Sequence, residues 1–310
     1  MTQNLSYGQL YYAKRMAQKL GITVEQYLAS KPGSVPPPPQ APKPVDFSKV
    51  TKLRNLNITE GMLKCNLTGL PIDDLFSYER GVPVGTNIMC TGDPGVGKTT
   101  LLLHTLAHLA VNHQGNGKRL RCLFICAEMN KIQMWKYTQR FPIFGEVDTI
   151  FTSDYMHDNL KDVLEQLLDC GYDYVLMDSI VEVLETVRED NGWGQSQAEK
   201  WLIDLCIKHN EGHNQATAFT SMLLIQQVTK NGLFVGSNKI KHITDAHMEM
   251  RRRSERDGGD TYIQFSKNRN GQSGIQFGYQ LSNDRIEYGT VRTEVEDEGD
   301  FSLDEPEKAF

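Results

Sequence analysis

One stretch of the sequence has the residue types and the spacing of a loop that binds phosphate. Residues 92–99 fit the pattern G-x-x-x-x-G-K-[ST] at every fixed position. Its glycines allow successive backbone N–H groups to point into one concavity at the positive end of a helix, where a polyphosphate binds. Lys98 is expected to reach the β- and γ-phosphates, and Thr99 to offer its hydroxyl to Mg²⁺. The sequence therefore predicts a site for ATP and Mg²⁺, made by Gly92, Asp93, Pro94, Gly95, Val96, Gly97, Lys98, Thr99 and Thr100.

Three polar side chains each follow a short apolar run that has the character of a buried strand. Asp178 follows residues 174–177 in the Walker B pattern, in which a carboxylate at a strand end holds the Mg²⁺ shell. Glu128 could orient and deprotonate the water that attacks the γ-phosphate, and Gln227 could sense whether that phosphate is present. The alternatives are a helix-capping aspartate, a surface glutamate and an amide that caps a loop.

Basic residues gather late in the sequence. Lys230, Lys239 and Lys241 lie in a stretch with glycines and could neutralise the phosphates of DNA. A solvated basic face is the competing interpretation of the same charges. Lys267 and Arg269 follow further along the chain.

Two other residue types give no sign of a metal site or a disulfide framework. The pairs His104/His108 and His209/His213 have the spacing of one helix face, but neither contains the glutamate of the H-E-x-x-H zinc motif. The six cysteines include no C-x-x-C pair. We interpret the histidines as ordinary helix-face residues and the cysteines as free thiols.

The elements around the phosphate loop have the order that its chemistry requires. An apolar strand is predicted over residues 86–91, and leucines at helical spacing predict a helix over residues 99–113. Further strands and helices alternate along the chain. The other strands are predicted at residues 123–127, 174–177 and 222–225, and the other helices at residues 130–140, 159–168 and 196–209. This alternation predicts an α/β fold with a mainly parallel central sheet, whose ligands gather at the carboxyl ends of the strands.

Composition divides the chain into four predicted parts. Residues 1–30 have the pattern of a small helical module, and seven prolines in residues 31–44 indicate an extended linker. Residues 45–293 form the predicted ATPase core, and residues 294–310 an acidic disordered tail. That tail carries a charge of about −7, so most of the net charge of −6 lies in it and the remainder of the chain is nearly neutral.

Targeting signals are missing from the sequence. No apolar run approaches the roughly 20 residues of a membrane span, and the first residues lack the order of a signal peptide. We therefore expect a cytoplasmic protein without a membrane partner.

Taken together, these motifs resemble those of a known family. Residues 68–85, the phosphate loop, residues 127–129 and residues 177–180 resemble the RecA-like ATPase core of the bacterial RadA/Sms recombination proteins. The similarity continues through Val228 to Gly232, Lys239 to Asp245 and Lys267 to Gly271, where the family's K-N-R-F-G motif has Asn270 in place of phenylalanine. The DnaB-type ring helicases are the neighbouring family.

The resemblance implies a homo-oligomer, a ring of subunits with ATP between neighbours and DNA in the central channel. Lys267 and Arg269 would then reach the γ-phosphate of the neighbouring subunit, as an arginine finger does. We expect an ATP-dependent helicase or translocase that acts on single-stranded DNA in recombination or replication, with a further protein partner at the N-terminal module or the acidic tail. The alternatives are a regulatory RecA-like ATPase that binds a protein and no nucleic acid, and a strand-exchange filament protein.

Overall fold

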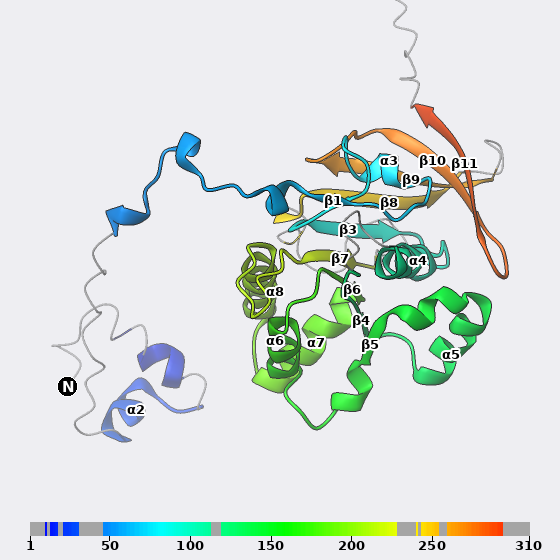
Figure 1. The fold of residues 1–310 in the computed structure, drawn as a ribbon. Helices are drawn as coiled ribbons and strands as arrows, with labels where there is room; N and C mark the ends of the chain where they lie inside the picture. Colours follow the sequence, from blue (N-terminus) through cyan, green and yellow to red (C-terminus); the bar gives the residue numbers. More distant parts are fainter. Residues whose placement is uncertain are drawn as a thin grey trace, which may run out of the picture. The chain divides into compact units, whose positions relative to one another are not determined.

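The computed structural model describes residues 10, 13–17, 21–30, 46–112, 119–227, 240, 243–253 and 259–293. The chain divides into two compact units, residues 1–57 and residues 58–310 (Figure 1). The predicted linker at residues 31–44 and the predicted acidic tail at residues 294–310 lie outside the described residues.

The first unit is small and has little apolar material to bury. Its described helices are residues 13–17 and α2 (Val24–Ser30). Thr23 and Gln26 exchange hydrogen bonds of 2.8 and 3.2 Å between backbone and side chain, which form a capping box at the start of α2. Ala13, Ala17 and Tyr27 form its buried cluster. The turns η1 (Phe47–Lys49) and η2 (Leu53–Asn55) follow.

The second unit is built on a twisted sheet (Figure 1). Its strands are β3 (Asn87–Gly92), β4 (Cys122–Cys126), β5 (Asp148–Phe151), β6 (Tyr174–Asp178), β7 (Ser221–Ile225), β8 (Ala246–Arg252), β9 (Thr261–Asn268), β10 (Ile275–Leu281) and β11 (Ile286–Thr293). Among the described residues their order is β11-β10-β9-β8-β3-β7-β6-β4-β5. The pairs from β8 to β5 are parallel, and the pairs among β8, β9, β10 and β11 are antiparallel. A short second sheet pairs β1 (Cys65–Asn66) with β2 (Val82–Pro83).

Helices cover both faces of the parallel part, so its strands are apolar on both sides. The helices of this unit are α3 (Asp73–Phe76), α4 (Lys98–Val111), α5 (Lys131–Arg140), α6 (Leu160–Asp169), α7 (Ile180–Asn191) and α8 (Gln195–Asn210). Tyr174 and Leu176 of β6 join the core cluster that contains α4, whereas Val175 and Met177 join the cluster with α6, α7 and α8. Alternate residues of one strand therefore belong to two separate cores.

The fold class expected from the sequence is confirmed, and each of the predicted strands and helices of the core lies within two residues of its observed position. The predicted pattern did not include α7, β5 or the four strands β8 to β11. Among the described residues, none of the helices combines the length and apolar character needed to cross a membrane.

The two histidines of α4 are half-buried next to a short turn. The rings of His104 and His108 are 4.4 Å apart, and His104 packs edge-on against Phe141 and Phe144, beside and within η4 (Pro142–Glu146). Within the described part of the chain no group of three His, Cys, Asp or Glu could hold a metal ion. Burial, and to a smaller extent the charge of His108, lowers the pKa of His104 from 6.5 to about 4.

We expect acid to destabilise the protein through His104. The unfolded chain binds a proton on this ring at a higher pH than the folded chain does, so the free energy of unfolding falls as the pH drops from about 6.5 toward 4. At pH 5 the loss amounts to about 2 kcal/mol relative to pH 7.5. The measurement is urea unfolding across this range for the wild type and for His104→Leu, which we expect to lose stability less steeply. His213→Gln, which changes an exposed histidine, is the control, and an equally steep loss in His104→Leu would contradict the assignment.

Candidate functional site

The phosphate loop joins a fully buried strand to the helix that covers it. Strand β3 ends at Gly92, and α4 begins at Lys98 after Gly97, whose φ of 95° favours glycine. Both glycines also stand where a side chain would collide with a neighbouring strand. A Cβ on Gly92 would lie 2.2 Å from the carbonyl oxygen of Met250 in β8, and one on Gly97 would lie 2.1 Å from Cδ1 of Leu281 in β10. The loop is therefore fitted closely against β8, the parallel neighbour of β3, and against β10.

Three hydrogen bonds hold this loop. The Lys98 ammonium donates to the carbonyl oxygens of Gly92 at 2.8 Å and Asp93 at 3.1 Å, so its charge lies over the loop where phosphates would bind. The buried Tyr279 of β10 donates its hydroxyl proton to the Val96 carbonyl at 2.7 Å. The loop is thus anchored from outside by a side chain that sequence reasoning did not single out.

Asp178 and Thr99 meet at the end of β6. The Thr99 hydroxyl donates a hydrogen bond to the Asp178 carboxylate, which is 2% exposed. Burial raises the pKa of Asp178 to about 6, and the hydrogen bond from Thr99 opposes that rise. These two hard oxygen donors beside the loop fit Mg²⁺, whose positive charge would favour the ionised carboxylate. The remaining ligands of the ion would be phosphate oxygens and water.

Glu128 and Gln227 are brought together at the same edge of the sheet. They follow β4 and β7, which flank β6 on either side, so the carboxyl ends of the three strands lie next to one another. The Gln227 amide donates a hydrogen bond of 2.7 Å to the Glu128 carboxylate, and both side chains are exposed. Glu128 is therefore accessible to a water molecule. The hydrogen bond connects the residue expected to orient the water with the residue expected to sense the γ-phosphate.

A cavity of about 520 Å³ connects these residues. Gly92, Lys98, Thr99, Glu128, Asp178 and Gln227 line it, and all six were expected from the sequence to belong to the site; Asp93 and Val96, also expected there, are not in its lining. Its other walls include Met129, Tyr137 and Arg140 from the segment after β4, and Leu281 from β10. Sequence reasoning missed these four. The spacing of Tyr137 and Arg140, which places both on one face of α5, is the signal that could have indicated the α5 wall.

Lys267 and Arg269 lie at the opposite end of the sheet from the phosphate loop. The Lys267 ammonium donates to the Thr244 carbonyl, and the Arg269 guanidinium contacts the Asp245 carboxylate at 3.1 Å. In the strand register, Asn268 is opposite Ala246, which pairs with Ile88 at the start of β3. Gly92 is four residues further along β3, so the two ends are separated by roughly 13 Å of strand. The chain does not bring these cations to its own phosphate loop.

A buried histidine joins the strands that carry these two ends. His247 of β8 is 1% exposed, and its ring nitrogens each lie 2.9 Å from a hydroxyl, Thr91 Oγ1 on one side and Ser266 Oγ on the other. Thr91 precedes Gly92, and Ser266 precedes Lys267. Polar contacts therefore cross three strands between the phosphate loop and the basic end. Lys230, Lys239 and Lys241, expected to bind DNA, lie outside the described residues.

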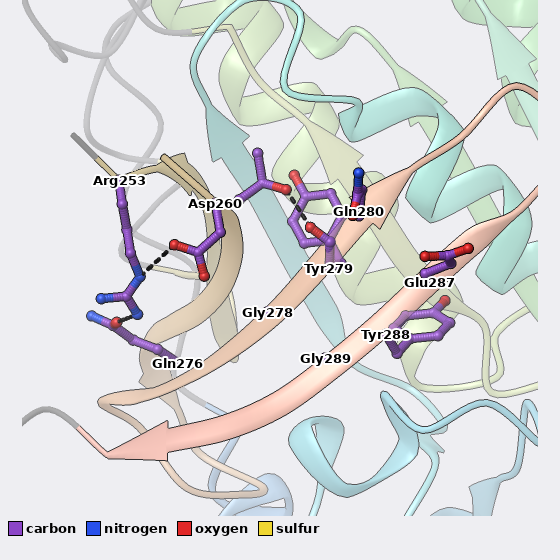
Figure 2. A pocket seen from close by; sticks show the side chains of 10 residues that line it. Arg253, Asp260, Gln276, Gly278, Tyr279, Gln280, Glu287, Tyr288 and Gly289 are labelled. Atoms are coloured by element: carbon purple, nitrogen blue, oxygen red, sulfur yellow. Dashed lines mark hydrogen bonds and ion pairs between the residues drawn. The ribbon is translucent and has the colours of Figure 1, made fainter. Parts of the chain in front are cut away.

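A second cavity, of about 260 Å³, lies over the antiparallel strands and is shown in Figure 2. Arg253 lines this cavity, and its guanidinium already has partners: it contacts Asp260 at 3.3 Å and donates a hydrogen bond to Gln276. Gly278 and Gly289 form part of its floor on the hairpin strands β10 and β11. The phosphate loop and the carboxylates converge on the first cavity and not on this one.

The sequence is similar to those of known DNA repair proteins. The sequence is 27% identical over 194 residues to the "DNA repair protein RadA" of Mycobacterium tuberculosis, a match that covers 62% of this chain and 36% of that protein. RadA of Aquifex aeolicus is 26% identical over 197 residues, which are 63% of this chain and 39% of that protein. The chain thus spans well under half the length of these relatives. No protein-family model matches the sequence.

The fold is also that of a solved structure. A KaiC-like protein from Pyrococcus horikoshii superposes with a TM-score of 0.53 at 15% identity, over 74% of this chain and the whole of that one. The sheet, the phosphate loop and these similarities support a RecA-superfamily ATPase core that resembles RadA.

We expect Gly92 and Gly95, two glycines of the phosphate loop, to respond differently to substitution by alanine. Gly92→Ala places a methyl group against the β8 backbone, and we expect it to lower the free energy of unfolding by about 3 kcal/mol or more. Gly95→Ala is the matched control, because a Cβ there has nothing within 4 Å and the φ of 76° costs only about 1–2 kcal/mol. Urea unfolding of both variants is the measurement. Equal losses would show that Gly92 is not constrained by β8.

Proposed function

We propose that the protein is an ATP-dependent DNA helicase or translocase of the RadA/DnaB type, which acts in recombination or replication. The observation that carries the proposal is the position of the two candidate half-sites. The phosphate loop with Glu128 and Asp178 lies at one end of the sheet, and Lys267 with Arg269 lies at the other. Such a chain completes its ATPase site with a second copy that is placed head to tail.

Each residue of the first half-site has a role in the proposed hydrolysis. Lys98 and the loop N–H groups bind the phosphates, and Thr99 and Asp178 hold Mg²⁺, which neutralises developing charge on the phosphate oxygens. Glu128 orients the attacking water and accepts its proton. Gln227, hydrogen-bonded to Glu128, reports whether the γ-phosphate is present. Lys267 and Arg269 of the neighbouring copy stabilise the charge that develops in the transition state.

Single-stranded DNA is the proposed partner. The relatives named above are DNA repair proteins, and Lys230, Lys239 and Lys241 follow the strand that ends beside Gln227. Lysines in the segment after β7 would connect the γ-phosphate with the nucleic acid. We further propose a cytoplasmic ring of identical subunits, with a replication or recombination protein bound at the N-terminal module or the tail.

Two alternative functions use the same nucleotide site. The net charge of −6 favours a regulatory ATPase that binds a protein partner and no nucleic acid. The head-to-tail arrangement also fits a strand-exchange filament, because a heterologous contact closes into a ring or opens into a helix according to its rotation. Particle images with an ATP analogue and DNA distinguish rings from filaments.

We expect single-stranded DNA to raise the rate of ATP hydrolysis severalfold at low salt, with the stimulation lost as salt increases. The measurement is steady-state phosphate release with and without a defined oligonucleotide. Lys239→Glu with Lys241→Glu should weaken the stimulation. No stimulation at low salt would favour the regulatory ATPase instead.

Glu128→Gln is the control for the chemistry in that assay. It keeps the shape of the side chain but removes the base. We therefore expect normal ATP binding and a hydrolysis rate that is reduced by about 100-fold or more. Unchanged turnover would exclude Glu128 from the proposed role.

Mixing two inactive variants tests whether the site is shared between copies. Lys98→Ala removes the phosphate lysine and Lys267→Ala removes the basic end, so neither protein alone should hydrolyse ATP at an appreciable rate. A mixture restores some sites that combine an intact loop from one copy with an intact Lys267 from the other. We expect phosphate release to reach a maximum near equal proportions. Absence of rescue at every ratio would contradict a shared site.

A further inference from the structure

The nucleotide cavity has two chemically different regions. The strand ends β4, β6 and β7 supply Glu128, Asp178 and Gln227, which suit phosphate, metal and water. Tyr137 of α5 and Leu281 of β10 line the cavity and also pack against the apolar cluster that contains α4. This second region therefore lies on the α4 face of the sheet and offers an aromatic ring and an aliphatic side chain.

One arginine connects the two walls of this region. Arg140, at the last position of α5, donates from Nε to the Asn283 carbonyl at 2.7 Å and from Nη2 to the Ser282 carbonyl at 3.3 Å. Its guanidinium carbon lies 5.6 Å from the centre of the Tyr137 ring and 5.5 Å from that of Phe141. Arg140 thus holds the turn that follows β10 against the aromatic side of α5.

The strand that leads into this turn also contacts the phosphate loop. Tyr279 binds the Val96 carbonyl, and Leu281 fills the space that a side chain on Gly97 would need. Figure 2 shows Tyr279 and Gln280 on β10 beside Glu287 and Tyr288 on β11. The turn is closed by a hydrogen bond of 2.9 Å from the Ser282 N–H to the Arg285 carbonyl. The hairpin therefore reaches from the phosphate loop to α5.

We propose that Arg140 is a positioning residue, which fastens the β10–β11 turn to α5 so that Tyr137 and Leu281 form the seat of the nucleotide base. The proposal rests on nucleotide binding in the proposed function and extends it to the base. An aromatic ring and an aliphatic side chain bind the flat face of a base by stacking and apolar contact. Phosphates gain nothing from such a surface, because they bind charges and N–H groups at the other end.

A comparison of two ligands tests the proposal. ATP contains the base, whereas inorganic tripolyphosphate has the same phosphate chain without it. We expect Arg140→Ala to weaken the binding of Mg²⁺-ATP about tenfold and to leave the binding of Mg²⁺-tripolyphosphate unchanged, measured by calorimetry. Leu281→Ala should give the same pattern, because it removes part of the seat.

Arg285→Ala is the matched control. Arg285 belongs to the same turn, but its side chain is exposed and pairs with Glu287 of β11 at 2.6 Å. We expect this variant to bind both ligands as the wild type does. Thermal unfolding of each variant without ligand shows whether it is folded.

The outcomes separate this proposal from the proposed function. If Arg140→Ala weakens both ligands equally, or weakens neither, Arg140 does not position a base seat. If the wild type itself binds neither ATP nor tripolyphosphate, the nucleotide site of the proposed function is wrong. Loss of ATP binding alone in Arg285→Ala would also overturn the role of Arg140, because it would show that any change in the turn has this effect.

Discussion

The close fit of the phosphate loop against β8 and β10 is the constraint on which the rest of the site depends. Gly92 has space for a hydrogen and no more beside the Met250 backbone carbonyl, whereas Gly97 faces the end of the flexible Leu281 side chain. The loop conformation thus depends on strands that lie more than 140 residues further along the sequence. Strand β8 pairs in parallel with β3, and β10 belongs to the antiparallel part of the sheet, so both parts of the sheet shape the nucleotide site.

The parallel part of the sheet supplies the reacting groups by geometry alone. Strands β7, β6 and β4 are neighbours. Asp178 is the last residue of β6, and Gln227 and Glu128 lie two residues beyond the ends of β7 and β4. Residues far apart in the sequence become adjacent because parallel strands end at one edge. The hydrogen bond between Gln227 and Glu128 is the direct result of this arrangement.

Local sequence patterns were enough to predict the loop, the strand ends and the fold class. The loop pattern, the apolar runs before Asp178 and Glu128, and the helical spacing of the leucines in α4 all act over a few residues. Tyr279, Leu281 and Arg140 could not be predicted in this way. Their roles arise from contacts between α4, α5 and β10 that no short pattern encodes. Strands β8 to β11 were also not predicted from the sequence. Charged and amide residues on their exposed side interrupt the apolar runs by which a strand is recognised.

The two ends of the β3, β8 and β9 ribbon make the chain directional. One end carries the loop that accepts a nucleotide, and the other carries the cations, with His247 buried between them. In the proposed arrangement each chain binds one nucleotide with its phosphate loop and supplies Lys267 and Arg269 to the nucleotide of its neighbour. A chain defective at one end would therefore disable one site, either its own or that of its neighbour, whereas a chain defective at both ends would disable two.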